Sequence, residues 1–230
     1  VCANDNTSFT VSADGNPIVY QWQVSTDGGN NWNNVSNGGV YSGATTSTLN
    51  LTGVAASYNG YKYRCVLSVN ACSSTVNSAA ATLTVNPNPT INLTAGPLTS
   101  LFPGLHTTLS AAVSPNPAAN YVWFLNGNAI ANTGATLQVD IDGLGEYAVG
   151  VIDVNGCIGL SNTVTISDSS NNSLFIYPNP NTGLFQVRYY EKQKGISNPR
   201  VMNIFDAKGS RVHQQQFITN NPFGRMDVNV

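Results

Sequence analysis

The strongest constraint on the fold is a strict alternation of apolar and polar residues in short segments between turn sequences. Residues 19–25, VYQWQVS, place Tyr20, Trp22 and Val24 on one face, and residues 61–69, YKYRCVLSV, alternate in the same way. A strand that is buried on one face repeats every two residues, whereas a helix repeats about every 3.6 residues. Helical periodicity is almost absent, so the sequence predicts an all-β protein in which these faces close β-sandwiches.

Two segments of the chain repeat each other. Trp22 in VYQWQV corresponds to Trp123 in NYVWFL, TLNLTGV corresponds to TLQVDIDGL, and the triplet ending at Cys72 corresponds to the one ending at Cys157. The Trp-to-Cys spacing is 50 residues in the first copy and 34 in the second, so the first copy has 16 additional residues. They lie within residues 25–46, which we predict to form an added hairpin. Such an internal repeat indicates tandem domains.

Two linkers divide the chain. Residues 86–89, NPNP, contain two prolines and predict a short, stiff connection, whereas residues 167–173, SDSSNNS, are polar and without pattern. The predicted domains are therefore residues 1–86 and 87–167, a linker at 168–173, and a small third module at 174–230, which we expect to be a β-sandwich.

Composition restricts the compartment and the partners. Only 9% of the residues are charged, and Asn, Ser, Thr and Gly fill the polar positions, which favours an exported β-protein. No apolar run approaches the roughly 18 residues of a membrane span. The chain begins at Val1 without a leader, so we expect a fragment of a longer or processed precursor.

The charge changes sign along the chain. Residues 1–173 contain two basic and eight acidic residues, whereas residues 174–230 contain seven basic and three acidic residues. The basic residues are scattered and are not interleaved with aromatic residues, so we expect solvated surface and no nucleic-acid partner.

The first two copies resemble immunoglobulin-type sandwiches. Trp22 is followed some forty residues later by Tyr63-Arg64-Cys65, the spacing of the core Trp and the tyrosine corner in that fold. The segments YQWQVS, GGNNW, NGYKYRC and GEYAVGVIDVNGC are similar to segments of the bacterial Ig-like and PKD-like repeats of large secreted proteins. The resemblance implies two tandem Ig-like β-sandwiches.

The same resemblance bears on the cysteines. An antibody-type bridge from Cys65 would need a cysteine on the first core strand, which offers Phe9 and Val11 instead. Similar bacterial repeats pair a cysteine near the domain start with one after the penultimate strand, which implies Cys2 with Cys72. A Cys2–Cys65 bridge and the absence of any bridge remain alternatives, and Cys157 has no partner in this scheme. No cysteine has a histidine within ligand spacing, so no zinc site is expected.

No catalytic residues, metal site or cofactor are predicted. His106 and His213 lie outside any nucleophile motif, and the sequence has no G-x-S-x-G, H-E-x-x-H or Gly-rich phosphate loop. The carboxylates Asp140, Asp142 and Glu146 in DIDGLGEY could bind calcium, but they also suit the turn before a strand, and turn chemistry is the favoured interpretation.

Two aromatic residues in the additional segment are candidates for ligand binding. The flat rings of Trp32 and Tyr41 could stack on sugar faces, as in carbohydrate-binding modules. The competing interpretation, which we favour, is that both rings pack within the hairpin.

The third module resembles the type A C-terminal sorting domain of the type IX secretion system. Strand-like runs are predicted at residues 184–190, 201–206, 211–217 and 226–230. The segments SLFIYPNPNTGLFQV and VMNIFDAKGSRV are similar to that family's opening and to its later hairpin. The positions that match the family are Tyr177, Pro178, Asn179, Pro180, Gly183, Phe205, Asp206, Gly209 and Val212. Since the family runs on for roughly one more hairpin, we expect the domain to be incomplete in this chain.

The resemblance implies a route and partners. A precursor of this family crosses the inner membrane, folds in the periplasm and passes the outer-membrane translocon, after which it is released or attached to lipopolysaccharide. The chain is accordingly interpreted as a non-catalytic region of a secreted or cell-surface protein, with Ig-like spacers and a sorting signal. The alternative is an adhesin or a polysaccharide-binding accessory module of a secreted enzyme.

Overall fold

A computed structural model describes residues 1–14, 17–69, 72–169, 174–177, 183–190, 198–219 and 223–229, without the side chains of residues 72–74, 198 and 219. These residues form strands and short 3-10 turns, which confirms the all-β prediction. They fall into two compact units, one of residues 1–90, 113–120 and 151–159, the other of residues 91–112, 121–150 and 160–230. Among the described residues, no helix is long and apolar enough to span a membrane.

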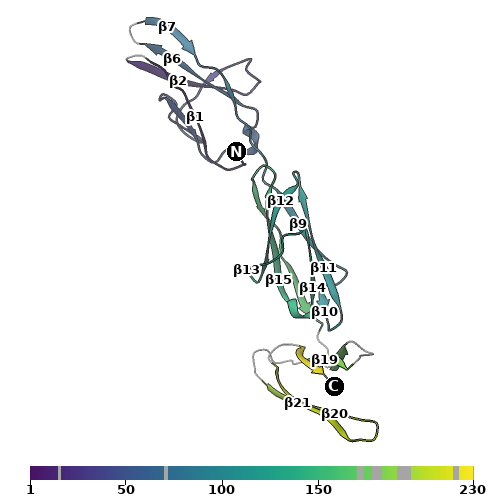
Figure 1. Ribbon diagram of the computed structural model, residues 1–230. Helices are drawn as coiled ribbons and strands as arrows, with labels where there is room; N and C mark the ends of the chain where they lie inside the picture. The colour runs from purple at the N-terminus through teal and green to yellow at the C-terminus, as the bar shows by residue number, and fades with distance from the viewer. Residues whose placement is uncertain are drawn as a thin grey trace. The chain divides into compact units, whose positions relative to one another are not determined.

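The first copy is a sandwich of two sheets. One has the strand order β1-β5-β4, and the other has the order β3-β2-β6-β7 with β8 also paired to β6. Figure 1 shows β2, β6 and β7 next to one another in the second of these sheets. The elements are β1 (Thr7–Thr10), β2 (Ile18–Ser25), β3 (Asn33–Asn34), β4 (Tyr41–Ser42), β5 (Thr48–Leu51), η1 (Ala56–Tyr58), β6 (Lys62–Val69), β7 (Cys72–Asn77) and β8 (Ala81–Thr82).

The alternating faces predicted from the sequence close the core of this copy. Trp22 on β2 lies opposite Cys65 on β6, and Trp22, Tyr63 and Cys65 are all buried. The additional segment does not form a hairpin of its own, because β3 pairs with β2 and β4 pairs with β5. Val35 and Ala44 of this segment are buried in the core, so the segment connects the two sheets and does not project from them.

The second copy has the same design. Its sheets have the orders β14-β11-β9 and β10-β17-β15-β12-β13, with β16 paired to β15. The elements are β9 (Thr90–Gly96), β10 (Ser100–Leu101), β11 (His106–Ser114), β12 (Ala118–Leu125), β13 (Asn128–Ile130), β14 (Thr136–Asp140), η2 (Ile141–Gly143), β15 (Gly145–Asp153), β16 (Ile158–Leu160) and β17 (Val164–Asp168).

Equivalent hydrogen bonds confirm the repeat. The Trp22 indole donates to the Thr46 carbonyl at 2.9 Å, and the Trp123 indole donates to the Gly134 carbonyl at 2.8 Å. Each Trp therefore satisfies its only donor within a buried site.

The two copies differ at the tyrosine that starts the later core strand. The Tyr147 hydroxyl donates to the Gly143 carbonyl, which is the tyrosine corner of Ig-like folds. The Tyr63 hydroxyl instead pairs with the Tyr41 hydroxyl at 3.1 Å. The additional segment of the first copy supplies Tyr41, so the insertion gives Tyr63 a different partner.

The described residues of the third module form the four predicted strands and one more. Its sheets have the orders β18-β19-β22 and β20-β21. The strands are β18 (Leu174–Tyr177), β19 (Leu184–Tyr189), β20 (Asn198–Phe205), β21 (Arg211–Thr219) and β22 (Gly224–Asn229). Val187, Met226 and Val228 form its buried core against Met202, Ile204 and other partly buried side chains, as predicted for a small β-sandwich.

The predicted cysteine pairing is wrong. Cys2 forms a disulfide with Cys157, with 5.5 Å between the Cα atoms, and Cys65 is a buried free thiol. Because one sulfur forms one disulfide, neither Cys2–Cys72 nor Cys2–Cys65 exists here; the side chain of Cys72 lies outside the described residues. Residues 151–159 belong to the same compact unit as Cys2, and the partner cysteine comes from the second copy. The predicted pairing was wrong because it was taken from single repeats, in which both cysteines belong to one copy.

Asp153 arranges the turn that presents Cys157. Its carboxylate is buried and accepts the backbone amides of Asn155 and Cys157 and the side-chain amide of Asn116 at 2.8–3.1 Å. Burial by itself would raise the pKa of Asp153, but these hydrogen bonds outweigh it and hold the pKa below its usual value. The ionised carboxylate therefore stabilises the turn at neutral pH.

Candidate functional site: the third module and its ion pair

Two motif residues, Asp206 and Gly209, determine the shape of the FDAKGS turn between β20 and β21. One Asp206 carboxylate oxygen accepts the backbone amides of Lys208 and Ser210, both at 2.8 Å, and the Gly209 amide donates to the Asp206 carbonyl at 3.0 Å. Gly209 has φ of +82°, a conformation that strains any residue with a Cβ. The aspartate and the glycine therefore fix the hairpin, and they do so with local contacts.

The apolar motif residues do not support the core. Tyr177 is 56% exposed, and Phe205 and Val212 are each 58% exposed. Gly183 precedes β19 with φ of +99°, as expected for a glycine that frees the chain before a strand. Pro178, Asn179 and Pro180 lie outside the described residues. Large exposed apolar side chains at motif positions indicate a surface that another molecule contacts.

An open groove lies between the two sheets of this module. Its volume is about 700 Å³, and its lining includes Ile176, Val187, Met202, Phe205 and Met226. The lining is mainly apolar, and Phe205 links it to the motif. The groove thus extends the exposed apolar surface of the module.

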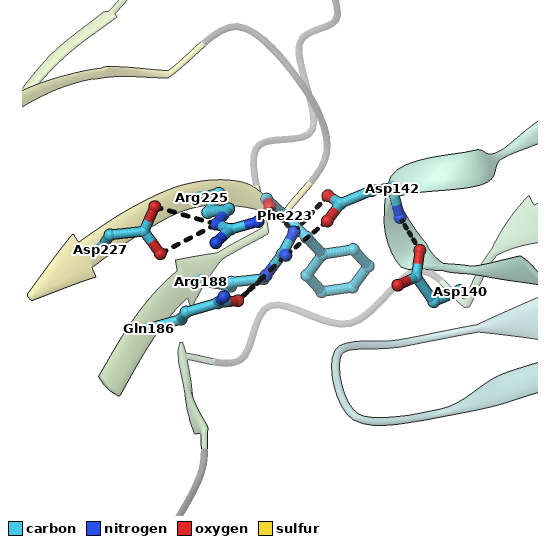
Figure 2. Close-up of polar contacts among 7 residues, drawn as sticks. All are labelled: Asp140, Asp142, Gln186, Arg188, Phe223, Arg225 and Asp227. Carbon is cyan, nitrogen blue, oxygen red and sulfur yellow. Dashed lines mark hydrogen bonds and ion pairs between the residues drawn. The ribbon is translucent and has the colours of Figure 1, made fainter. Parts of the chain in front are cut away.

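A buried arginine joins the third module to the second copy. Arg188 on β19 is only 6% exposed, and its guanidinium forms two hydrogen bonds to Asp142 in η2, at 2.5 and 2.7 Å (Figure 2). The guanidinium also donates to the side chain of Gln186 and to the Phe223 carbonyl. Paired hydrogen bonds between guanidinium and carboxylate fix both distance and orientation.

The Arg188 guanidinium holds the pKa of Asp142 below its usual range, although partial burial acts in the opposite direction. Asp140 has a local role, since its carboxylate accepts the Asp142 amide and caps η2. This is the arrangement that the turn interpretation of DIDGLGEY predicts. Within the described ranges, no group of three His, Cys, Asp or Glu residues could hold a metal ion.

A polar pocket of about 400 Å³ adjoins the ion pair. His106, Asp140, Tyr177, Gln186 and Arg225 are among its lining residues. His106 is exposed and lies opposite Asp140 across the β11–β14 pair. The lining contains no Ser, Thr or Cys side chain. The other histidine, His213, is half-buried on β21, away from this lining.

The two candidate aromatic residues are held by neighbouring groups. The Trp32 indole donates to the Gly29 carbonyl at 3.0 Å, and the Arg64 guanidinium lies 4.2 Å from the centre of the ring. Tyr41 contacts Tyr58 and Tyr63 edge-on. Both rings are half-buried. Only the bond to Gly29 lies within the additional segment, whereas the other contacts pack the two rings against β6 and η1. Stacking on sugars stays a prediction.

Sequence reasoning did not find Arg188 or its role. Its partner lies 46 residues away, and an alternating strand pattern assigns an arginine to solvent. The one available signal was an arginine directly after Val187 in the largely apolar sequence LFQVRY of β19.

Two segments of the chain match sequence families. Residues 1–87 match a domain of unknown function, DUF8696, and residues 175–230 match the secretion system C-terminal sorting domain. The second match confirms the predicted type IX sorting domain. A protein with this domain is recognised by the type IX secretion machinery and is secreted or attached to the outer-membrane surface. No curated protein matches the chain in sequence.

Two solved structures with some similarity contain Ig domains. The N-terminal four Ig domains of Dscam1 isoform 7.44 are 15% identical with a TM-score of 0.37, over 73% of this chain and 42% of that one. The N-terminal eight Ig domains of Down Syndrome Cell Adhesion Molecule isoform 1.30.30 are 12% identical with a TM-score of 0.34, over 99% of this chain and 34% of that one. The chain spans less than half of either structure, and likenesses at this level support no argument about function.

Proposed function

We propose that the chain is a non-catalytic region of a secreted or cell-surface bacterial protein, in which two Ig-like spacer domains precede a type IX sorting signal. The proposed limits are residues 1–86 and 87–167 for the spacers and 174–230 for the signal. The route passes through the periplasm, and the translocon and its sorting machinery are the partners.

The observation that supports this proposal is that the motif residues of the third module have two different roles. Asp206 and Gly209 determine the shape of the hairpin, whereas Phe205 and Val212 display apolar side chains on its surface. A residue that only stabilised the module would be buried, because burial is the source of apolar stabilisation. Exposed apolar residues on a rigid turn suit recognition by a second protein.

The spacer role rests on how the Ig-like copies use their aromatic residues. Trp22 and Tyr63 in the first copy, and Trp123 and Tyr147 in the second, are buried and hydrogen-bonded. These four side chains therefore pack in the cores of the two copies. Attachment to lipopolysaccharide after processing is part of the proposal, whereas polysaccharide binding by Trp32 and Tyr41 has only their half exposure in its favour.

Export of the protein from a strain with a working type IX system tests the proposal. We expect Phe205→Ser/Val212→Ser to retain the protein in the periplasm while its thermal unfolding is unchanged, since both side chains are more than half exposed. The matched control is Ile218→Ser, which changes a side chain of β21 that is 70% exposed but lies outside the motif. Normal export of the double variant would contradict the proposal.

A further inference from the structure

The first Ig-like copy carries two cations on one face of a sheet. Lys62 and Arg64 are the only Lys and Arg residues among residues 1–173, which contain eight acidic residues. They lie two positions apart on β6, so both side chains point to the outer face, away from the buried Tyr63 and Cys65. The positive charge of an otherwise acidic segment is thus concentrated at one place on its surface.

The fold adds three flat side chains to these cations. Arg64 lies opposite Gln23 of β2, and Gln23 lies opposite Asn34 of β3. The Arg64 Nε donates to Gln23 Oε1, and the Gln23 Nε2 donates to Asn34 Oδ1, both at 2.9 Å. The Arg64 guanidinium also lies 4.2 Å from the centre of the Trp32 ring. We call this set, Trp32, Asn34, Gln23, Lys62 and Arg64, the basic face; its members come from three strands and the turn before β3.

A tight turn fixes the position of Trp32 beside Arg64. The Asp27 carboxylate accepts the Asn31 amide at 2.9 Å and the Ser25 hydroxyl at 2.7 Å. These hydrogen bonds hold the pKa of Asp27 well below its usual range. The carboxylate is therefore engaged by its own turn, and the aromatic side of the basic face is ordered before any ligand binds, which reduces the entropy lost on binding.

The two cations retain donors for a ligand. Within the described part of the chain, neither Lys62 nor Arg64 forms an ion pair with a carboxylate. Arg64 uses its Nε for Gln23, whereas its two terminal nitrogens form no hydrogen bond to a described residue. Both cations are partly exposed, and Asn34 is exposed. The terminal nitrogens of arginine form the paired hydrogen bonds that fit a carboxylate, so the basic face suits an anionic ligand.

We propose that the basic face binds an acidic polysaccharide, a polymer of sugar rings that carry carboxylate groups. The carboxylates pair with Arg64 and Lys62, and the sugar hydroxyls, which both donate and accept, bind the exposed amide of Asn34. Neighbouring strands lie about 4.8 Å apart, so the face extends about 10 Å from β3 to β6 and contacts more than one group along the polymer. Trp32 positions Arg64, and Tyr41 does not belong to this site. The site is separate from the proposed sorting signal.

Tryptophan fluorescence of the full chain tests the site, because Trp32 lies in it whereas Trp22 and Trp123 are buried. The probes are polygalacturonate, alginate and hyaluronate. We expect a saturable change with at least one of them, weakened as salt rises from about 50 mM to about 500 mM. The methyl ester of the polymer that binds has the same rings without the charge. It should bind about tenfold more weakly or worse, since it cannot form the charge-assisted hydrogen bonds.

Arg64→Gln should weaken binding by about tenfold or more, and Arg64→Lys by less, because lysine keeps the charge but not the paired donors. The matched control is Arg211→Gln, which removes the same charge from an exposed position on β21 and should bind normally. Lys62→Gln replaces Arg64→Gln if thermal unfolding shows that the latter does not fold.

Four results would each overturn the proposal: no saturable change with any of the three polymers, equal affinity for acid and ester, an equal loss in Arg211→Gln, or equal affinity for polyglutamate. The last two would mean that the protein responds to charge alone. None of them affects the sorting proposal, because that proposal is tested by export.

Discussion

Replacing Cys157 by serine opens a covalent loop that encloses most of the two Ig-like copies. In the oxidised protein, a force applied between the chain ends passes from residue 2 to residue 157 through the two sulfur atoms. The residues between them, a sequence separation of 155, bear no tension and cannot extend, and the bond spans only 5.5 Å between Cα atoms. A protein held at the cell surface by its C-terminal side would thus transmit load past most of its two Ig-like copies.

The magnitude follows from the length of the loop. An extended chain spans at most about 3.3–3.6 Å per residue, so opening a loop with a separation of 155 residues adds about 510–560 Å of contour length. The bond also removes entropy from the unfolded chain, and the chain-entropy estimate for a loop of this length is about 5 kcal/mol.

Optical tweezers with handles at the two ends measure the contour length directly. We expect Cys157→Ser, or reductant added to the natural protein, to release the extra length, whereas oxidised protein does not. Cys65→Ala is the matched control, because Cys65 is buried and free, and its removal leaves the bond intact. Equal full extension of oxidised protein and Cys157→Ser would refute the reasoning. A hidden length of only about 230–250 Å would instead indicate a bond over about 70 residues, from Cys2 to Cys72.

Three further predictions concern single side chains. Tyr147→Phe removes the hydrogen bond to Gly143 and should lower the free energy of unfolding of the second copy by about 1 kcal/mol in urea titrations. Because Arg188 lowers the pKa of Asp142, their ion pair stabilises the folded protein above about pH 4, and this stability is lost as the pH falls through the lowered pKa. The urea concentration at the unfolding midpoint should therefore fall less between about pH 7 and about pH 3 in Asp142→Asn than in the natural protein. Gly209→Val forces a β-branched residue to φ of +82° and should destabilise the β20–β21 hairpin by about 1–2 kcal/mol, seen as faster amide exchange there.

Features that depend on neighbouring residues were predictable. Alternation in YKYRCVLSV gave the faces of β6, because a strand has one side-chain period whatever it packs against. The FDAKGS turn was predictable for the same reason, since Asp206 bonds to amides only two and four residues away. The additional segment was predicted less well, because pairing of β3 with β2 and of β4 with β5 depends on which sheet is within reach.

Contacts between distant segments were not predictable. Cys157 follows the same Asn-x-Cys pattern as Cys72, so this pattern does not distinguish the cysteine that bonds to Cys2. Asp153 differs from its counterpart Ser68 in the first copy, and its carboxylate holds the amide of Cys157. In retrospect the aspartate was the distinguishing residue, but its effect requires the turn to be folded.

The carboxylates of DIDGLGEY show why residue type alone does not assign a role. Asp140 bonds to an amide two residues away, so its function as a cap is set by the local chain. Asp142 is more than half exposed by side-chain area, yet it neutralises a guanidinium that is almost fully buried. Removing Asp142 would leave the buried Arg188 guanidinium without its carboxylate partner, which is costlier than losing a surface ion pair. The burial of the arginine, and not the exposure of the aspartate, therefore determines how strongly this contact links η2 to β19.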